Sequence, residues 1–132
     1  MGKFGTAALK AHKLATGKRP PNPSDAWDQA TTSIWGGGTS SQMKSCPKNA
    51  FLGLCEAARV RGIKSGAYTR SLKNKGYAVE AADILKANPS LVSLGEIGLW
   101  QKVMKSLGEP VGKVHNQQMD VVLTLFQNKL TH

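Results

Sequence analysis

The chain has 132 residues, a length that suits one domain with one hydrophobic core. Hydrophobic residues make up 40% of it and aromatic residues only 6%, and this balance, rich in Ala and Leu, favours helices over a β-sandwich. No apolar run approaches the ~20 residues that cross a bilayer, and residues 1–19 lack the apolar core of a secretory signal. We therefore expect a cytoplasmic, all-α single domain, an irregular bundle of five or six helices without membrane contact.

The net charge of +10 is unevenly distributed along the chain. Residues 1–75 contain 13 Lys or Arg and 3 Asp or Glu, whereas residues 76–132 contain five of each kind. Such an excess of positive charge is typical of a protein with an anionic partner. Nucleic acid is the partner that we expect; an acidic protein, a phosphate-bearing small molecule and a basic surface that only aids solubility are the alternatives.

The first half of the chain contains three predicted helices. Residues 3–15 have apolar residues at helical spacing, and a connector at residues 17–24, rich in proline, follows them. Ser24 is the expected N-cap of a second helix that ends near Trp35 before three glycines. Its apolar face is expected to be Trp27, Ala30, Thr31 and Ile34. After a short helical turn at residues 39–45, a third helix opens at Pro47, capped by Ser45 or Cys46, and breaks at Gly62, with an inner stripe of Phe51, Leu54, Cys55 and Ala58.

Three more helices are predicted in the second half. The fourth runs from about Ser71 to Asn88 and buries Ala78, Ala81, Ala82 and Leu85. The fifth is defined by Ile97, Trp100, Met104 and Leu107 and ends at Gly108. The last is the most hydrophobic, from Met119 to Leu130 with Asn116 as its N-cap, so we expect it to be central in the bundle.

A charged turn lies between the third and fourth predicted helices. The segment AARVRGIKSGAYTRSLKNKG, residues 57–76, resembles the helix-turn-helix of bacterial DNA-binding domains of the Fis-like kind. The resemblance implies a first helix within residues 46–61, a turn at Gly62 and a recognition helix at residues 65–74. The nucleic-acid contacts would then be Lys64, Ser65, Thr69 and Arg70 in the major groove and Arg59, Arg61, Lys73 and Lys75 on phosphates. Arg61 stands where an apolar residue is usual, and a basic loop between two scaffold helices is the alternative.

A second resemblance covers most of the chain. The phrases SCPKNAFLGLCEA, GAYTRSLKNKGYAVEA and HNQQMDVVLTLF are similar to those of a group of small helical bacterial proteins of unassigned function, which includes integron gene-cassette products. This resemblance implies an all-helical domain and supplies no activity.

The residue types also allow two other kinds of site. Cys46 at a helix N-terminus, with His115 as base and Asn116 or Asp120 as orienting group, would make a Cys-His-Asn type arrangement. Such trios occur by chance, so we expect no enzyme, and the spacing of Cys and His predicts neither a metal site nor a cofactor. Cys46 and Cys55 are expected to be free thiols. The alternative function is a binding pocket at helix ends, formed by Cys46, Tyr68, Trp100, His115 and Asn116, for a small ligand or a protein partner.

Overall fold

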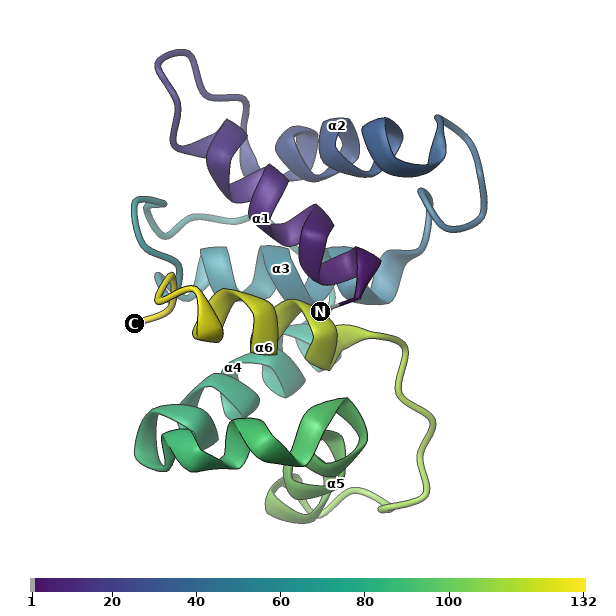
Figure 1. Cartoon of the computed structure of the whole chain (residues 1–132), viewed down its shortest axis with the longest axis vertical. Coiled ribbons are helices and arrows are strands. Elements are labelled where there is room, and N and C mark those ends of the chain that lie inside the picture. The colour runs from purple at the N-terminus through teal and green to yellow at the C-terminus, as the bar shows by residue number, and fades with distance from the viewer. Residues whose placement is uncertain (1) are drawn as a thin grey trace.

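The structure is a computed structural model that describes residues 2–132 as one all-α domain. Its six α-helices and one 3-10 helix are α1 (Lys3–Ala15), α2 (Pro23–Trp35), α3 (Ser45–Glu56), α4 (Leu72–Ala87), η1 (Pro89–Leu94), α5 (Gly95–Leu107) and α6 (Gln118–Gln127). Figure 1 shows α1 and α2 at one end of the molecule and α4 and α5 at the other, with α3 and α6 between them. The predicted all-α bundle of five or six helices is confirmed.

Helix α6 is the central element, as its sequence predicted. It packs against α1, α3, α4 and α5, and every residue from Gln118 to Leu125 is buried. Because this helix packs against four others, and apolar area removed from water contributes about 25 cal/mol per Å², its burial makes a large hydrophobic contribution to the fold. The core around it includes the tilted ring pair Trp27 and Phe51, with centroids 5.4 Å apart.

A buried carboxylate fixes α1 onto α6. The two oxygens of Asp120 accept hydrogen bonds from the backbone N–H groups of Gly2, at 2.9 Å, and Gly5, at 2.8 Å. These donors lie in the first turn of α1, where N–H groups have no partner inside the helix and where negative charge is favourable. The close approach requires glycine, because a Cβ at Gly5 would lie 2.0 Å from the Thr124 hydroxyl oxygen.

Several predicted boundaries differ from the structure. The N-cap of α2 is Asn22, whose side chain accepts from the Asp25 N–H, and Ser24 lies inside the helix. Lys44 precedes α3, so Ser45 and Cys46 are helical residues and do not cap it. Gln117, in the left-handed conformation, precedes α6 in place of Asn116. The start of each of these three helices differs from the predicted start by one or two residues, because it depends on backbone conformation that the amino-acid sequence alone does not reveal.

Two predicted core positions are also wrong. Helix α3 ends at Glu56, and Ala58 is exposed with a φ of 58°, because the chain turns away at that point. Ile97 is 62% exposed, since α5 buries Leu99, Trp100, Val103 and Met104. The buried face of α5 is thus rotated from the one that the spacing Ile97, Trp100, Met104 and Leu107 predicted. No helix among residues 2–132 is long and apolar enough to cross a bilayer.

We predict opposite effects for alanine at two helical glycines. Gly5→Ala should lower the free energy of unfolding by about 2 kcal/mol, because the new methyl group meets the Thr124 side chain and the Asp120 carboxylate. Gly76→Ala, in α4, has no heavy atom within 4 Å of the new Cβ and should raise it by about 1 kcal/mol through helix propensity. Urea unfolding followed by circular dichroism measures both. Equal changes at the two positions would contradict the close packing of α1 on α6.

Candidate functional site

Residues 57–71, between α3 and α4, form a loop. The recognition helix at residues 65–74 that the resemblance implied is therefore wrong, and the alternative, a basic loop between two scaffold helices, is confirmed. Only the last three positions of the expected recognition helix are helical, as the start of α4. In such a helix the Thr69 N–H would bond to the Ser65 carbonyl; here the N–H groups of Tyr68 and Thr69 donate to one oxygen of Glu56, at 2.9 and 3.2 Å. A side chain thus satisfies the backbone groups that a helix would have paired, and the segment stays extended.

Glu56 organises this loop. Its second carboxylate oxygen accepts a 2.7 Å hydrogen bond from the Lys75 ammonium group in α4. That bond, together with the N–H groups of Thr69 and Tyr68, lowers the pKa of Glu56 to about 2. Sequence reasoning missed this residue, although Glu56 is one of only three acids in the basic first 75 residues.

The eight residues predicted to contact nucleic acid fall into two groups. Three have intramolecular partners: Arg59 pairs with Asp83 and also donates to the His132 carbonyl, Lys75 pairs with Glu56, and the Thr69 hydroxyl bonds to Asn49. The others that carry charge are exposed and form no ion pair with the described residues: Arg61, Lys64, Arg70 and Lys73. Ser65 is exposed as well.

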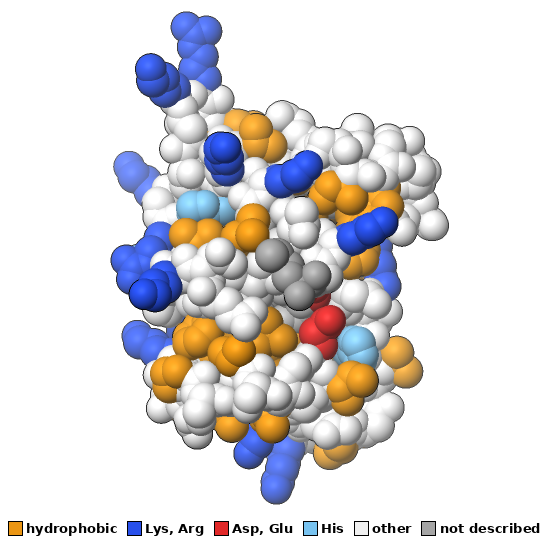
Figure 2. Space-filling model, viewed as in Figure 1, with side chains coloured by type: hydrophobic (Ala, Val, Ile, Leu, Met, Phe, Trp, Pro, Cys, Tyr) orange, Lys and Arg blue, Asp and Glu red, His pale blue; other side chains and the backbone are white. Residues whose placement is uncertain are grey.

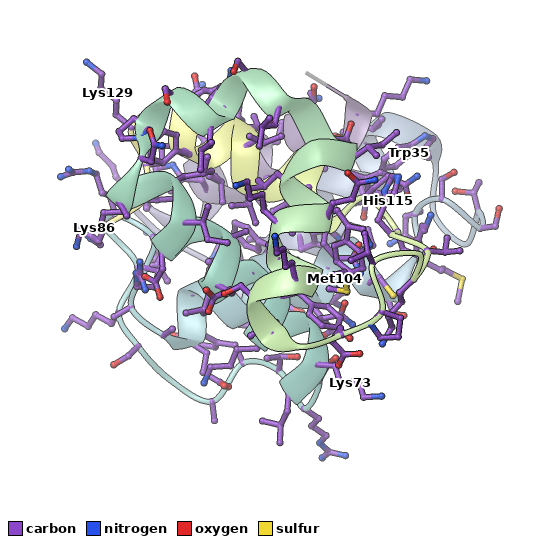
Figure 3. The ribbon with its side chains drawn as sticks, turned by 90° about the horizontal axis from the view of Figure 1, so that it is seen from below. Trp35, Lys73, Lys86, Met104, His115 and Lys129 are labelled. Carbon is purple, nitrogen blue, oxygen red and sulfur yellow. The ribbon has the colours of Figure 1, made fainter. Side chains whose placement is uncertain are left out.

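These residues do not share one face. The Arg61 N–H donates to the Leu130 carbonyl at 2.8 Å, which places Arg61 beside the chain segment that contains Lys129. Figure 3 shows Lys73 on the opposite side of the molecule from Lys129. A single flat DNA surface made from residues 59–75 is therefore absent from this fold.

The five residues of the alternative pocket are also divided. Trp100 lies 6.4 Å from His115, centroid to centroid, and forms an edge contact with Tyr77 at 5.1 Å. Lys44 donates to Gln117, so Cys46 and Asn116 lie near that same end of α3. Tyr68 is bound to Glu56 at the other end of this helix of 12 residues, about 18 Å away. None of these five residues lines the groove described below.

The cysteine arrangement is not assembled either. Both thiols are free, as predicted, but no hydrogen bond between Cys46 and His115 is present in the part of the chain that the structure describes. Asp120, the alternative orienting group, is occupied by the first turn of α1. Burial raises the pKa of the Cys55 thiol to about 12, which keeps it protonated and unreactive. Residues 2–132 contain no group of three His, Cys, Asp or Glu side chains placed to hold a metal ion.

A groove of about 820 Å³ lies between α1, α2 and the connector that joins them. Four cationic residues line it, Lys10 and Lys13 from α1 and Lys18 and Arg19 from the connector, and no carboxylate among the described residues does. Leu14, Pro20 and Pro21 supply apolar surface. Lys10 reaches across to the Ser33 hydroxyl of α2 at 3.4 Å. The groove arises because Ala7, Ala8, Ala11, Ala26 and Ala30 let α1 and α2 pack closely along their buried faces, while the connector spreads outward at their ends.

The positive surface continues past the groove. The His12 ring nitrogen lies 2.8 Å from the Arg61 carbonyl oxygen, and a Cβ at Gly62 would lie 3.0 Å from the Thr16 methyl, so the loop packs on the last turns of α1. We name the exposed cations Lys10, Lys13, Lys18, Arg19 and Arg61 the basic edge. Figure 2 shows Lys and Arg side chains at the connector and down that side of the molecule. Sequence reasoning missed the four cations of α1 and the connector. The prolines beside them were the available signal, because they indicate a rigid connector that would hold Lys18 and Arg19 in fixed positions.

The whole chain, residues 1–132, belongs to the family of unknown function DUF6979. No curated protein and no solved structure matches it. The family assignment agrees with the resemblance to helical proteins of unassigned function, and it brings no activity to the site.

We predict that Glu56→Gln loosens the loop and lowers stability at neutral pH. Because the folded pKa of Glu56, about 2, lies below the unfolded value near 4.5, the carboxylate stabilises the fold above pH ~4.5, and this contribution disappears as the pH falls toward 2. The difference in urea midpoint between wild type and variant should therefore be largest at pH 7 and should shrink between pH 4.5 and 2. Glu109→Gln, in the 3.6 Å surface pair with Lys113, is the control and should change little. An unchanged midpoint for Glu56→Gln at pH 7 would contradict this role.

Proposed function

For this member of a family without an assigned function, we propose that the protein binds nucleic acid through the phosphate backbone, along the basic edge. The observation that carries the proposal is that its five cations are exposed and form no ion pair with the described residues. By contrast, Lys48, Arg59, Lys75 and Lys113 all have carboxylate partners. Cations without internal partners are available to neutralise phosphates.

The position of the connector indicates that its cations do more than stabilise the fold. Lys13 lies in the last turn of α1, where a positive charge also favours the helix dipole. Lys18 and Arg19 lie beyond the end of α1, and so they gain little from that effect. Pro20, Pro21 and Pro23 restrict the connector, so ordering it on a ligand costs less conformational entropy than ordering a flexible loop would.

The expected mode is readout of shape and charge. The recognition helix that would place side chains on base edges in the major groove is absent, so the contacts available to duplex DNA are those to phosphate and sugar. Such contacts bind without sequence preference and weaken steeply with salt. The predicted contribution of Arg61 remains part of this proposal, and those of Arg59 and Lys75 do not, because their partners are inside the molecule.

We predict that a mixed-sequence DNA of about 20 nucleotides, as duplex and as single strand, binds at low salt with affinity that falls as salt rises. Five phosphate contacts give a slope of about −4 for log K against log salt with the duplex. Lys13→Gln/Lys18→Gln/Arg19→Gln should reduce the slope to about −2 and weaken binding at low salt. Fluorescence anisotropy of a labelled strand measures both quantities.

The matched control is Lys86→Gln/Lys102→Gln/Lys105→Gln, which removes the same net charge from exposed positions on α4 and α5. It should leave the slope near −4. No binding of either form of DNA at ~20 mM salt, or equal losses in the two triple variants, would contradict the proposal.

A further inference from the structure

The groove between α1, α2 and the connector contains apolar residues as well as cations, and a site that bound only phosphate would not need them. Its cations lie beside apolar surface from Leu14 of α1 and from Pro20 and Pro21 of the connector. Leu14 is 37% exposed, whereas the alanines on the buried side of α1 are fully covered. A site for phosphate alone would be polar throughout, so the apolar part indicates a ligand with both an anionic and a flat apolar portion.

We propose that this groove accepts one unstacked nucleobase of a single-stranded nucleic acid, while the cations at its margin hold the adjoining phosphates. This inference rests on the proposed function and names the form of nucleic acid that the same edge prefers. A volume of about 820 Å³ lies within the usual range for small-molecule sites, about 300–1,000 Å³, and exceeds what a lone phosphate would fill.

The polar groups of α2 suit the edge of a base. Gln29 lines the groove with an amide that can both donate and accept, and the Ser33 hydroxyl lies one turn further along the same helix. Ser33 donates to the Ala30 carbonyl at 2.7 Å and receives the Lys10 ammonium at 3.4 Å, which holds the Lys10 side chain across one end of the groove. A base would therefore lie between the α1 and α2 walls, with its edge toward Gln29.

A duplex can place its phosphates along the cations but cannot insert a base into the groove, because its bases are stacked and paired, and extruding one costs a few kcal/mol. A single strand presents its bases freely. None of the residues in the range 2–132 that line the groove is aromatic, so the contact is weaker than stacking on Trp or Tyr and tolerates any base.

The test compares two strands of equal charge, an oligothymidine of about twelve nucleotides and an abasic strand of the same length, by anisotropy at fixed salt. Wild type should bind the oligothymidine about five-fold more tightly than the abasic strand. Leu14→Gln should remove most of that difference without changing the affinity for the abasic strand. Leu72→Gln, at a 77% exposed leucine outside the groove, is the control and should retain the difference.

Each outcome separates this inference from the proposed function. Equal affinity of wild type for the two strands overturns the inference and leaves backbone binding intact. A five-fold preference that Leu14→Gln retains also overturns it, since the base would then lie elsewhere. Failure of both strands and of duplex DNA to bind overturns the proposed function itself. Circular dichroism spectra and urea midpoints of both leucine variants, equal to those of wild type, exclude unfolding as the cause of any loss.

Discussion

The carboxylate of Asp120 holds two helices that are far apart in the sequence, since it accepts the N–H groups of Gly2 and Gly5 from within the buried face of α6. A buried charge is costly unless it is hydrogen-bonded, and the first turn of α1 supplies donors that would otherwise lack partners. The position and tilt of α1 follow from this contact and from the space that Gly5 leaves for Thr124. The same contact therefore also determines where the exposed side chains of α1, including Lys10 and Lys13 of the basic edge, lie.

Helix α1 positions the residues of the basic edge through contacts on two of its sides. On one side α1 packs against α2 through small side chains, and the connector projects Lys18 and Arg19 from the end of that pair. On the other side His12 reaches the Arg61 carbonyl and brings the loop against the helix. Glu56 holds the far part of the same loop to α4 through Lys75. His12 of α1 and Glu56 of α3 therefore hold the two parts of this charged loop in place.

Most of the fold followed from the sequence because amphipathic periodicity is local. The spacing of apolar residues placed α1, α4 and the central α6, and Gly108 and Asn88 marked helix ends. The loop at residues 57–71 could not be predicted in this way, since its conformation depends on Glu56 receiving N–H groups 12 and 13 residues away. The groove also depends on how α1 and α2 pack, and no pattern in either helix alone contains that information. Arg59 was assigned to phosphate for the same reason: its partner Asp83 lies 24 residues further along.

The pairing of Gly2 and Gly5 with Asp120 has a consequence for synthesis of the chain. Gly2 and Gly5 are 118 and 115 positions away from Asp120, and they must meet it before α1 can pack on α6. The chain must therefore close a long loop to complete its core. While the chain is being made, the alanine face of α1 can reach α2 but has no α6 to cover it until residue 120 has left the ribosome. Residues 1–75, with 13 of the 18 cations, therefore acquire their final arrangement only after the last helix has formed.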